Sequence, residues 1–234
     1  MSNSKRVAGR KAAERVQSGQ IVGLGTGSTV FYTLERLGER VRDDGLELRG
    51  IPTSTDTETK AREFGIPLMT LDELEGKIDL TIDGADEING DFHMIKGGGG
   101  ALLREKVVAS LSREVTIIVH AEKVVADLGA AFPLPVELVP FARTPVRRAL
   151  QALGAEPLLR VDEHGHPFLT DNGNEILDCA FEGGIADPDA LALALSGIPG
   201  VVESGLFLDL CDHLVIGLAD GGIEERSRAQ PARN

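Results

Sequence analysis

The side chains best suited to binding a small ligand stand in short polar stretches, each of which follows an apolar run. The first stretch, residues 23–29 (GLGTGST), combines glycines with the hydroxyl residues Thr26, Ser28 and Thr29. At the start of a helix, such hydroxyls and the first backbone N–H groups form a phosphate site, and a glycine such as Gly27 lets the ligand approach the backbone closely. The alternative is a tight turn followed by a capped helix.

The same stretch departs from two nucleotide-binding motifs. A dinucleotide fingerprint needs an acidic residue about 20 residues later. The expected second strand instead ends in the neutral sequence Pro-Thr-Ser-Thr at 52–55. A Walker loop needs a Gly-Lys-Ser/Thr sequence, and none follows here. A nucleotide-dependent oxidoreductase is therefore disfavoured.

A second stretch, Asp83-Gly84-Ala85-Asp86-Glu87, is acidic and follows the expected strand KIDLTI. Bringing three carboxylates together is costly unless they bind something. A hard cation is one candidate, because such ions take carboxylate ligands. The hydroxyls of a polyol are another. The alternative is an acidic turn exposed to solvent.

Lys96 and the four glycines that follow it form the third stretch. Ordering four glycines costs much backbone entropy, so the run indicates N–H groups that must converge on an oxygen atom. Together with the Lys96 charge, the amides of Gly97, Gly98 and Gly99 would make an oxyanion-type site. The alternative, a flexible linker, fits poorly inside a compact strand–helix unit.

Glu105 lies in the next expected helix, and its neighbours at helical spacing (Ala101, Leu102, Val108 and Ala109) are apolar. The basic residues on either side of it point elsewhere, because adjacent helix residues do not share a face. If this face lies against the site, the carboxylate is partly desolvated and its pKa is raised, which suits a general base near neutral pH. The alternative is a surface glutamate favoured by the helix dipole.

Other charged residues give weaker signals. Lys5 and Lys123 are candidate cations for a phosphate, although each lysine taken alone is more typical of a solvent-exposed side chain. His164 and His166 lie in an expected hairpin turn with no third ligand nearby. We interpret that pair as part of a loop and predict no metal site.

Composition limits the class of partner. The chain has 234 residues, a net charge of −13 and 4% aromatic residues. Nucleic acids and anionic membranes bind clustered positive charge, and base stacking needs aromatic rings, so both partners are disfavoured. No apolar run approaches the roughly 18 residues of a membrane span. Cys179 and Cys211 are too few for a disulfide framework, so we expect reduced core thiols and a cytoplasmic protein.

The elements that must position these stretches alternate between strands and helices up to about residue 121. Such alternation is typical of a parallel sheet covered by helices on both faces, with ligands beyond the carboxyl ends of the strands. The spacing predicts a first helix that ends near residue 19 and later helices over 28–42, 55–65 and 101–112. The predicted strands are QIVGLG, LELRGIP, IPLMT, KIDLTID, FHMIKG and VTIIVHA.

After about residue 129 the predicted order becomes β-α-β-β-α-β, typical of a ferredoxin-like unit. The strand HLVIGLA is expected to return to the first sheet, and the polar tail from Glu224 to be frayed. We therefore predict an α/β fold: a Rossmann-like parallel sheet domain with helices on both faces, plus a smaller α+β ferredoxin-like domain. The first comprises residues 1–129 together with 206–234, and the second residues 130–205.

Taken together and in this order, the motifs resemble the ribose-5-phosphate isomerase A family. The resemblance implies interconversion of D-ribose 5-phosphate and D-ribulose 5-phosphate in the non-oxidative pentose phosphate pathway, without a cofactor, by a homodimer or homotetramer. It covers nearly the whole chain. The matching motifs are GLGTGST at 23–29, TSTD at 53–56, DGADEI at 83–88, KGGGGALLREK at 96–106, PLPVE at 133–137, TDNGN at 170–174 and IPGVV at 198–202.

The resemblance also implies roles for single residues. Glu105 would move a proton between two carbons, Lys96 and the glycine amides would stabilise the enediolate, and Asp83 and Asp86 would hold hydroxyls and assist ring opening. Two residues depart from the family pattern: Gly100, where the family favours alanine, and His120. The implied substrate-binding residues are Thr26, Gly27, Ser28, Thr29, Asp83, Gly84, Ala85, Asp86, Lys96, Gly97, Gly98, Gly99 and Lys123.

Two rival functions follow from the same residues. A non-catalytic sugar-phosphate sensor would keep the phosphate loop, add a helix-turn-helix region and have no need of Glu105. A metal-dependent sugar isomerase would use Asp83, Asp86 and Glu87 as ligands, and its activity would be lost in EDTA.

Overall fold

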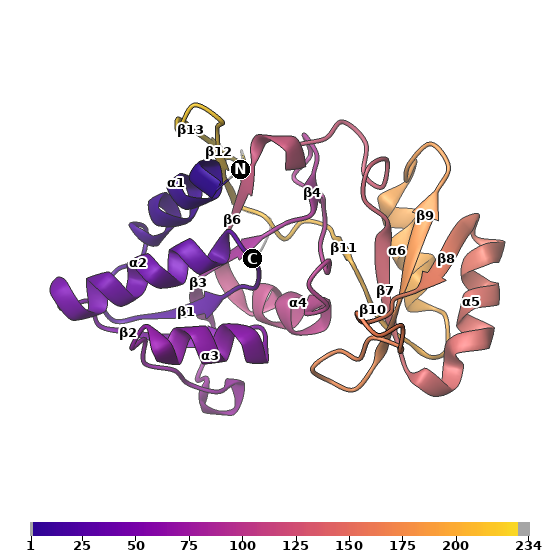
Figure 1. Ribbon diagram of the computed structural model, residues 1–234, viewed down its shortest axis with the longest axis horizontal. Helices are drawn as coiled ribbons and strands as arrows, with labels where there is room; N and C mark the ends of the chain where they lie inside the picture. The colour runs from indigo at the N-terminus through magenta and orange to yellow at the C-terminus, as the bar shows by residue number, and fades with distance from the viewer. Residues whose placement is uncertain (1, 229–234) are drawn as a thin grey trace. The chain divides into compact units, whose positions relative to one another are not determined.

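The computed structural model describes residues 2–228, and the chain divides into two compact units (Figure 1). The first unit holds the described residues up to Ala85, then Arg104–Val124 and the residues from Asp209 onward, and the second holds Asp86–Leu103 and Val125–Leu208. Relative to the predicted domain boundaries, residues 86–103, 125–129 and 206–208 group with the second unit. Three short strands within these segments pair with one another, which explains part of the difference.

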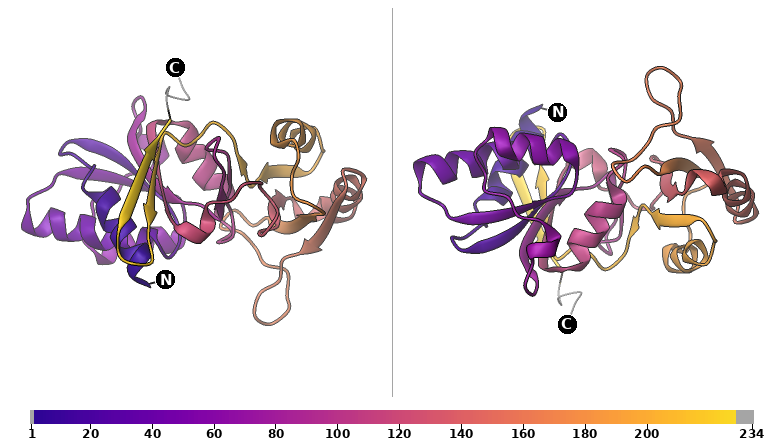
Figure 2. Two further views of the ribbon diagram at one scale, coloured as in Figure 1. Left: turned by 90° about the horizontal axis from the view of Figure 1, so that it is seen from above. Right: turned by 90° about the horizontal axis from the view of Figure 1, so that it is seen from below.

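The first unit is built on a six-stranded sheet in the order β13-β12-β6-β3-β1-β2. All neighbouring strands are parallel except β12 and β13, which pair antiparallel (Figure 2). This confirms the predicted α/β sheet and the return of the HLVIGLA strand to it. Its strands are β1 (Gln20–Leu24), β2 (Leu48–Pro52), β3 (Ile78–Gly84), β6 (Ser112–His120), β12 (His213–Gly217) and β13 (Ile223–Ser227).

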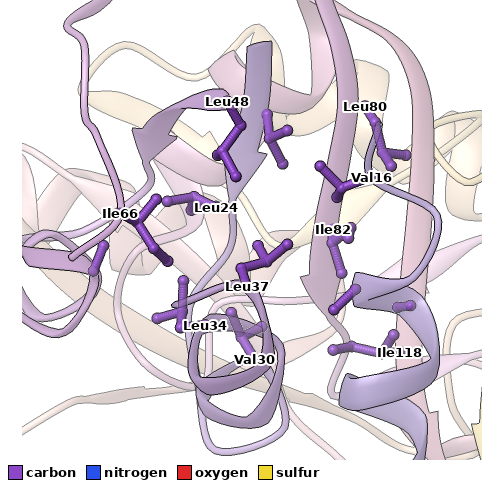
Figure 3. Packing of buried hydrophobic residues seen from close by; sticks show 14 of the residues in the cluster. Val16, Leu24, Val30, Leu34, Leu37, Leu48, Ile66, Leu80, Ile82 and Ile118 are labelled. Carbon is purple, nitrogen blue, oxygen red and sulfur yellow. The ribbon is translucent and has the colours of Figure 1, made fainter. Parts of the chain in front are cut away.

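Apolar helix faces cover both sides of this sheet. Leu34 and Leu37 of α2 join Leu24 of β1 in the larger core cluster (Figure 3). Ile21, which points to the opposite face of β1, packs against a second cluster that includes Val108 of α4. The helices that contribute to this unit are α1 (Ser2–Ala13), α2 (Val30–Asp43), α3 (Thr55–Glu63) and α4 (Leu102–Ser110), with 3-10 turns η1 (Leu71–Glu73) and η2 (Ala121–Lys123).

Helix α3 begins at Thr55, as predicted, and its cap is Ser54, whose hydroxyl accepts the N–H of Thr57. Two local predictions for this unit were wrong. The predicted strand IPLMT forms only an isolated bridge from Leu68 to Gly50. The tail, predicted to be frayed from Glu224, instead forms β13, whose exposed residues pair through the backbone; residues 229–234 of the tail lie outside the described residues. Pairing of that kind leaves no hydrophobic pattern in the sequence.

The second unit contains a four-stranded antiparallel sheet in the order β10-β7-β9-β8. Strands and helices follow along the chain as β7-α5-β8-β9-α6-β10, which confirms the predicted ferredoxin-like order. The elements are β7 (Leu134–Leu138), η3 (Pro140–Ala142), α5 (Arg143–Ala152), β8 (Ala155–Leu159), β9 (Glu175–Phe181), α6 (Pro188–Ser196) and β10 (Val201–Ser204).

A small three-stranded sheet completes the second unit. It has the order β11-β5-β4 and is formed by β4 (Glu87–Ile88), β5 (Met94–Ile95) and β11 (Leu206–Phe207). The run VVESGLFL, predicted as one strand, is therefore divided at Gly205 between two sheets. No helix within residues 2–228 is long and apolar enough to cross a membrane. Cys179 is a buried core thiol, and burial raises its pKa to about 12.

Candidate active site

The glycine-rich stretch 23–29 forms the turn from β1 into α2, as predicted. Gly27 and Ser28 are exposed, and α2 begins at Val30. Thr29 stands at the cap position, but its side chain makes no capping hydrogen bond. The Thr29 hydroxyl therefore does not cap the first turn, in which the N–H groups of Phe31 and Tyr32 donate to the carbonyl oxygens of Gly27 and Thr29.

Asp83 holds this loop from the end of the neighbouring strand β3. Its Oδ1 atom accepts the N–H of Thr26 at 3.0 Å and the N–H of Gly84 at 2.7 Å, and only 2% of the residue is exposed. A buried carboxylate needs such partners. Sequence reasoning gave Asp83 a role toward substrate only, so this support of the loop is an added finding.

The hydroxyl of Thr26 points into a cluster of other hydroxyls. It lies 2.8 Å from the Thr53 hydroxyl, 2.9 Å from that of Ser54 and 3.2 Å from that of Thr57. Thr57 in turn donates to the carbonyl oxygen of Gly25 at 2.7 Å. Sequence reasoning missed this cluster, although the hydroxyl-rich sequence at 53–57 was a signal for it. It ties the glycine-rich turn to the end of β2 and the start of α3.

Two lysines bring positive charge to the same end of the first unit. Lys5 donates to the Ser28 hydroxyl at 2.9 Å. Burial lowers the pKa of His120, and the charges of Lys5 and Lys123 lower it further, so both lysines lie close enough to act on this histidine. An exposed loop with these cations nearby is suited to a phosphate group.

Glu105 is buried on the first turn of α4, with 5% of the residue exposed. Val108, one turn later on the same face, packs against β1: a Cβ atom on Gly23 would lie 2.7 Å from a Val108 methyl group, so only glycine allows this approach. Because α4 leads into β6, its N-terminal turn lies toward the carboxyl ends of the parallel strands. The structure thus rules out the alternative of a surface glutamate.

The remaining predicted residues belong to the second unit. Lys96 is buried, with 3% exposed, and its ammonium group lies 5.3 Å from the centre of the Phe207 ring. Gly97 has a φ of 103°, a conformation that favours glycine. The N–H of Gly98 donates to Oδ2 of Asp86 at 2.7 Å, so one of the three amides expected to face an oxyanion is bound within the protein.

The carboxylate of Glu87 binds backbone N–H groups, which does not fit the role of a metal ligand. Its carboxylate accepts the N–H groups of Gly129 at 2.6 Å, Phe132 at 2.8 Å and Ala131 at 3.1 Å. These bonds fasten the segment that leads from the first unit into β7. Within residues 2–228, no group of three or more His, Cys, Asp or Glu side chains is placed to hold a metal ion. His164 and His166 lie in the exposed loop between β8 and β9, as predicted.

The structure places the predicted residues in two sets, one in each unit. The chain passes directly from Ala85 of one unit to Asp86 of the other, and α4 carries it back at Arg104. The set in the first unit comprises Thr26, Gly27, Ser28, Thr29, Asp83, Gly84, Ala85, Glu105 and Lys123, and the set in the second comprises Asp86, Lys96, Gly97, Gly98 and Gly99.

Comparison with known proteins identifies the relatives of this chain. Residues 49–221 match the family model of ribose 5-phosphate isomerase A (phosphoriboisomerase A). Ribose-5-phosphate isomerase A of Listeria innocua is 50% identical over 224 residues, which are 96% of this chain and 98% of that protein.

Solved structures agree over the same length. Ribose 5-phosphate isomerase from Plasmodium falciparum has a TM-score of 0.94 at 38% identity, covering 98% of this chain and 100% of that one. A D-ribose-5-phosphate isomerase in complex with phospho-erythronic acid has a TM-score of 0.92 at 34% identity, covering 96% and 98%. The chain described here therefore belongs to the ribose 5-phosphate isomerase A family.

Proposed function

We propose that this protein interconverts D-ribose 5-phosphate and D-ribulose 5-phosphate by proton transfer through an enediolate. Membership of the family supports the substrate. The observation that carries the chemistry is Glu105, a carboxylate buried at the carboxyl edge of the parallel sheet, where α/β proteins bind their ligands.

In this proposal Glu105 is the base and the acid in turn. Its carboxylate takes the proton from C2 of the open-chain aldose, the C–H electron pair forms the C1–C2 double bond, and the carbonyl oxygen on C1 becomes negative. Glu105 then returns the proton to C1, while the proton of the C2 hydroxyl passes to the oxygen on C1. The product is the ketose, so atoms and charge balance with no other reactant.

The other residues divide into three roles. The N–H groups and hydroxyls of Thr26, Gly27, Ser28 and Thr29 would hold the phosphate, with a lysine charge from Lys5 or Lys123. Lys96 and amides of the glycine loop would stabilise the enediolate oxygen, an interaction that is stronger in the transition state than in the bound substrate. Asp83 and Asp86 would position hydroxyls and assist ring opening.

Two broader proposals accompany this one. Phe141 is 99% exposed and Leu193 76% exposed in the second unit, which supports burial of these side chains against a second copy in a homodimer or homotetramer. Light scattering on the purified protein tests that state. The reduced thiol of Cys179 supports a cytoplasmic location.

The experiment that tests the function is a coupled assay with ribose 5-phosphate in the presence of EDTA. The proposal predicts full activity, because every proton-transfer and charge-stabilising group is a side chain or amide of the chain. Loss of activity in EDTA that added divalent ions restore would favour the metal-dependent isomerase. A protein that binds ribose 5-phosphate without converting it would be a sensor.

A further inference from the structure

Arg160 holds the glycine loop from the side of the four-stranded sheet. It directly follows β8, and its Nη1 atom donates to the carbonyl oxygen of Gly97 at 2.9 Å and to that of Gly98 at 3.1 Å. Two successive carbonyl groups of the loop therefore point toward one guanidinium group. All of these residues lie within the second unit.

The guanidinium group is itself held in place. Its Nε atom donates to Oδ2 of Asp178 at 2.9 Å and its Nη2 atom to Oδ1 at 2.5 Å, a bidentate pair with a residue of β9. The ring of Phe168 lies 5.9 Å from the guanidinium carbon. The backbone N–H of Arg160 donates to Ile176 at 2.9 Å, and the side chain is only 14% exposed. An arginine fixed in this way loses little side-chain conformational entropy when it forms its hydrogen bonds to the loop.

The directions of the loop amides follow from these bonds. A trans peptide places its N–H opposite its carbonyl group, and the described residues contain no cis peptide bond. The peptide between Gly97 and Gly98 obeys this rule, with its carbonyl on Arg160 and its N–H on Asp86. In the next peptide Arg160 holds the Gly98 carbonyl, so the N–H of Gly99 is turned to the opposite side.

The N–H of Gly99 is available to a ligand. Gly99 is exposed, and within residues 2–228 its N–H has no hydrogen-bond acceptor. A glycine run can turn its peptide planes at little steric cost, so hydrogen bonds must set their direction. The Gly97 carbonyl oxygen also accepts the N–H of Gly100 at 2.9 Å, and Arg160 adds the contact that holds the Gly98 carbonyl.

We propose that Arg160 is a positioning residue for the isomerase: by holding the carbonyls of Gly97 and Gly98, it directs the Gly99 N–H toward the negative oxygen of the enediolate. Arg160 itself touches no reacting atom. The inference rests on the proposed function, because it needs a negative oxygen at that amide. Sequence reasoning gave no role to Arg160, which stands between two recognised motifs.

The test compares R160M with R143M. Arg143 also forms a bidentate pair with a carboxylate of β9, that of Glu175, but in the described part of the chain no hydrogen bond joins it to the glycine loop. We expect R160M to lower kcat for ribose 5-phosphate by about 10- to 100-fold, the cost of misplacing a stabilising group. R143M should keep kcat within about twofold of the wild type.

The affinities for two ligands distinguish a positioning role of Arg160 from general damage to the fold. Phospho-erythronic acid carries a carboxylate that resembles the charged enediolate, whereas inorganic phosphate probes only the phosphate loop. R160M should bind phospho-erythronic acid about tenfold or more weakly than the wild type and bind inorganic phosphate unchanged. If R160M fails to fold, R160K, which keeps the charge but not the planar fork, should show the same two effects to a smaller degree.

The outcomes are distinct. If the wild type isomerises ribose 5-phosphate and R160M and R160K match R143M in kcat and in affinity for phospho-erythronic acid, Arg160 only stabilises the unit and this inference is wrong. If the wild type does not isomerise ribose 5-phosphate, the proposed function itself fails, whatever the variants do.

Discussion

Oδ1 of Asp83 accepts the backbone N–H of Thr26 at 3.0 Å, which fastens the glycine-rich loop to the end of the neighbouring strand. Asp79, at the start of the same strand, makes a similar bond: its Oδ2 atom accepts the N–H of Ile21 at 2.9 Å. The two aspartates therefore join β3 to the β1 segment in the same way, but only Asp83 does so beside the loop. This pair offers a matched test of the loop.

D83A should destabilise the protein and also weaken phosphate binding. A hydrogen bond to a charged group contributes about 1.5–3 kcal/mol, so the free energy of unfolding should fall by about that amount. Because the loop loses its support, affinity for inorganic phosphate should fall about tenfold or more, equivalent to about 1.4 kcal/mol. D79A should lose stability and keep phosphate affinity. Equal phosphate affinity in both variants would show that Asp83 does not organise the loop.

His120 should report phosphate binding through its pKa. Burial, together with the charges of Lys5 and Lys123, lowers the pKa of this histidine below its usual 6.5. A phosphate dianion bound by these lysines would offset their charge, so the pKa of His120 should rise when inorganic phosphate is added. Titration of the ring resonances by NMR measures both values.

Substituting the two lysines one at a time identifies which of them binds the phosphate. K5M and K123M should each raise the pKa of His120 in the absence of phosphate, since each removes a repelling charge. The variant in which phosphate no longer shifts the pKa marks the lysine that binds it. A His120 pKa that does not respond to phosphate in the wild type would place the phosphate elsewhere.

Gly100 and Phe168 should be coupled energetically. A Cβ atom on Gly100 would lie 2.5 Å from the Phe168 ring, which also lies beside Arg160, so G100A must displace that ring. We expect this overpacking to cost about 1–3 kcal/mol of stability, in addition to the strain of an alanine at a φ of 78°, which F168V does not relieve. F168V should relieve the clash, and a double-mutant cycle should give a coupling of about 0.5–3 kcal/mol. Strictly additive effects in urea unfolding would show that the ring does not fill this space.

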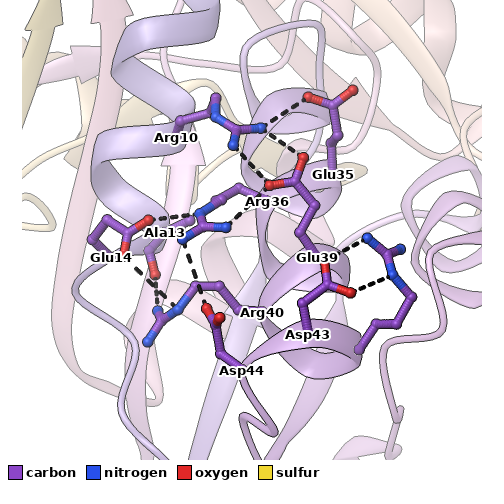
Figure 4. A network of polar contacts seen from close by, with 10 residues as sticks. Arg10, Ala13, Glu14, Glu35, Arg36, Glu39, Arg40, Asp43 and Asp44 are labelled. Atoms are coloured by element: carbon purple, nitrogen blue, oxygen red, sulfur yellow. Dashed lines mark hydrogen bonds and ion pairs between the residues drawn. The ribbon is translucent and has the colours of Figure 1, made fainter.

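Glu39 should make stability depend on pH in the acid range. This residue of α2 accepts hydrogen bonds from Arg10 of α1 and Arg36 of α2 (Figure 4), and the bond from Arg10 is the main cause that lowers its pKa from 4.5 to about 2. The folded state therefore holds its proton less tightly than the unfolded state. The contribution of Glu39 is complete above pH 4.5 and is lost as the pH falls toward 2.

The E39Q variant tests the direction of this pH dependence. The difference in unfolding free energy between wild type and E39Q should be constant above about pH 5 and should shrink between about pH 4.5 and 2. Urea unfolding at several pH values measures it. A difference that grows as the pH falls would contradict the assignment.

The parallel sheet and the ferredoxin-like order could be predicted from the sequence, because buried strands and amphipathic helices impose their periods on it. Glu105 could be placed on an apolar helix face for the same reason. The contacts that hold the site residues in place could not be predicted in this way. Arg160 reaches residues more than 60 positions away, and Thr26 meets hydroxyls from another strand end. Contacts of that range leave no local pattern, and the exposed strand β13 has no apolar period at all.

The central claim is that Glu105 carries the proton between the two carbons of the substrate. The direct measurement is the kcat of E105Q with ribose 5-phosphate, with E63Q on the exposed side of α3 as the matched change. E105Q should lose at least about 100-fold in kcat and keep its affinity for inorganic phosphate, because an amide of the same shape cannot accept the proton. Turnover of E105Q within about threefold of E63Q would contradict the account.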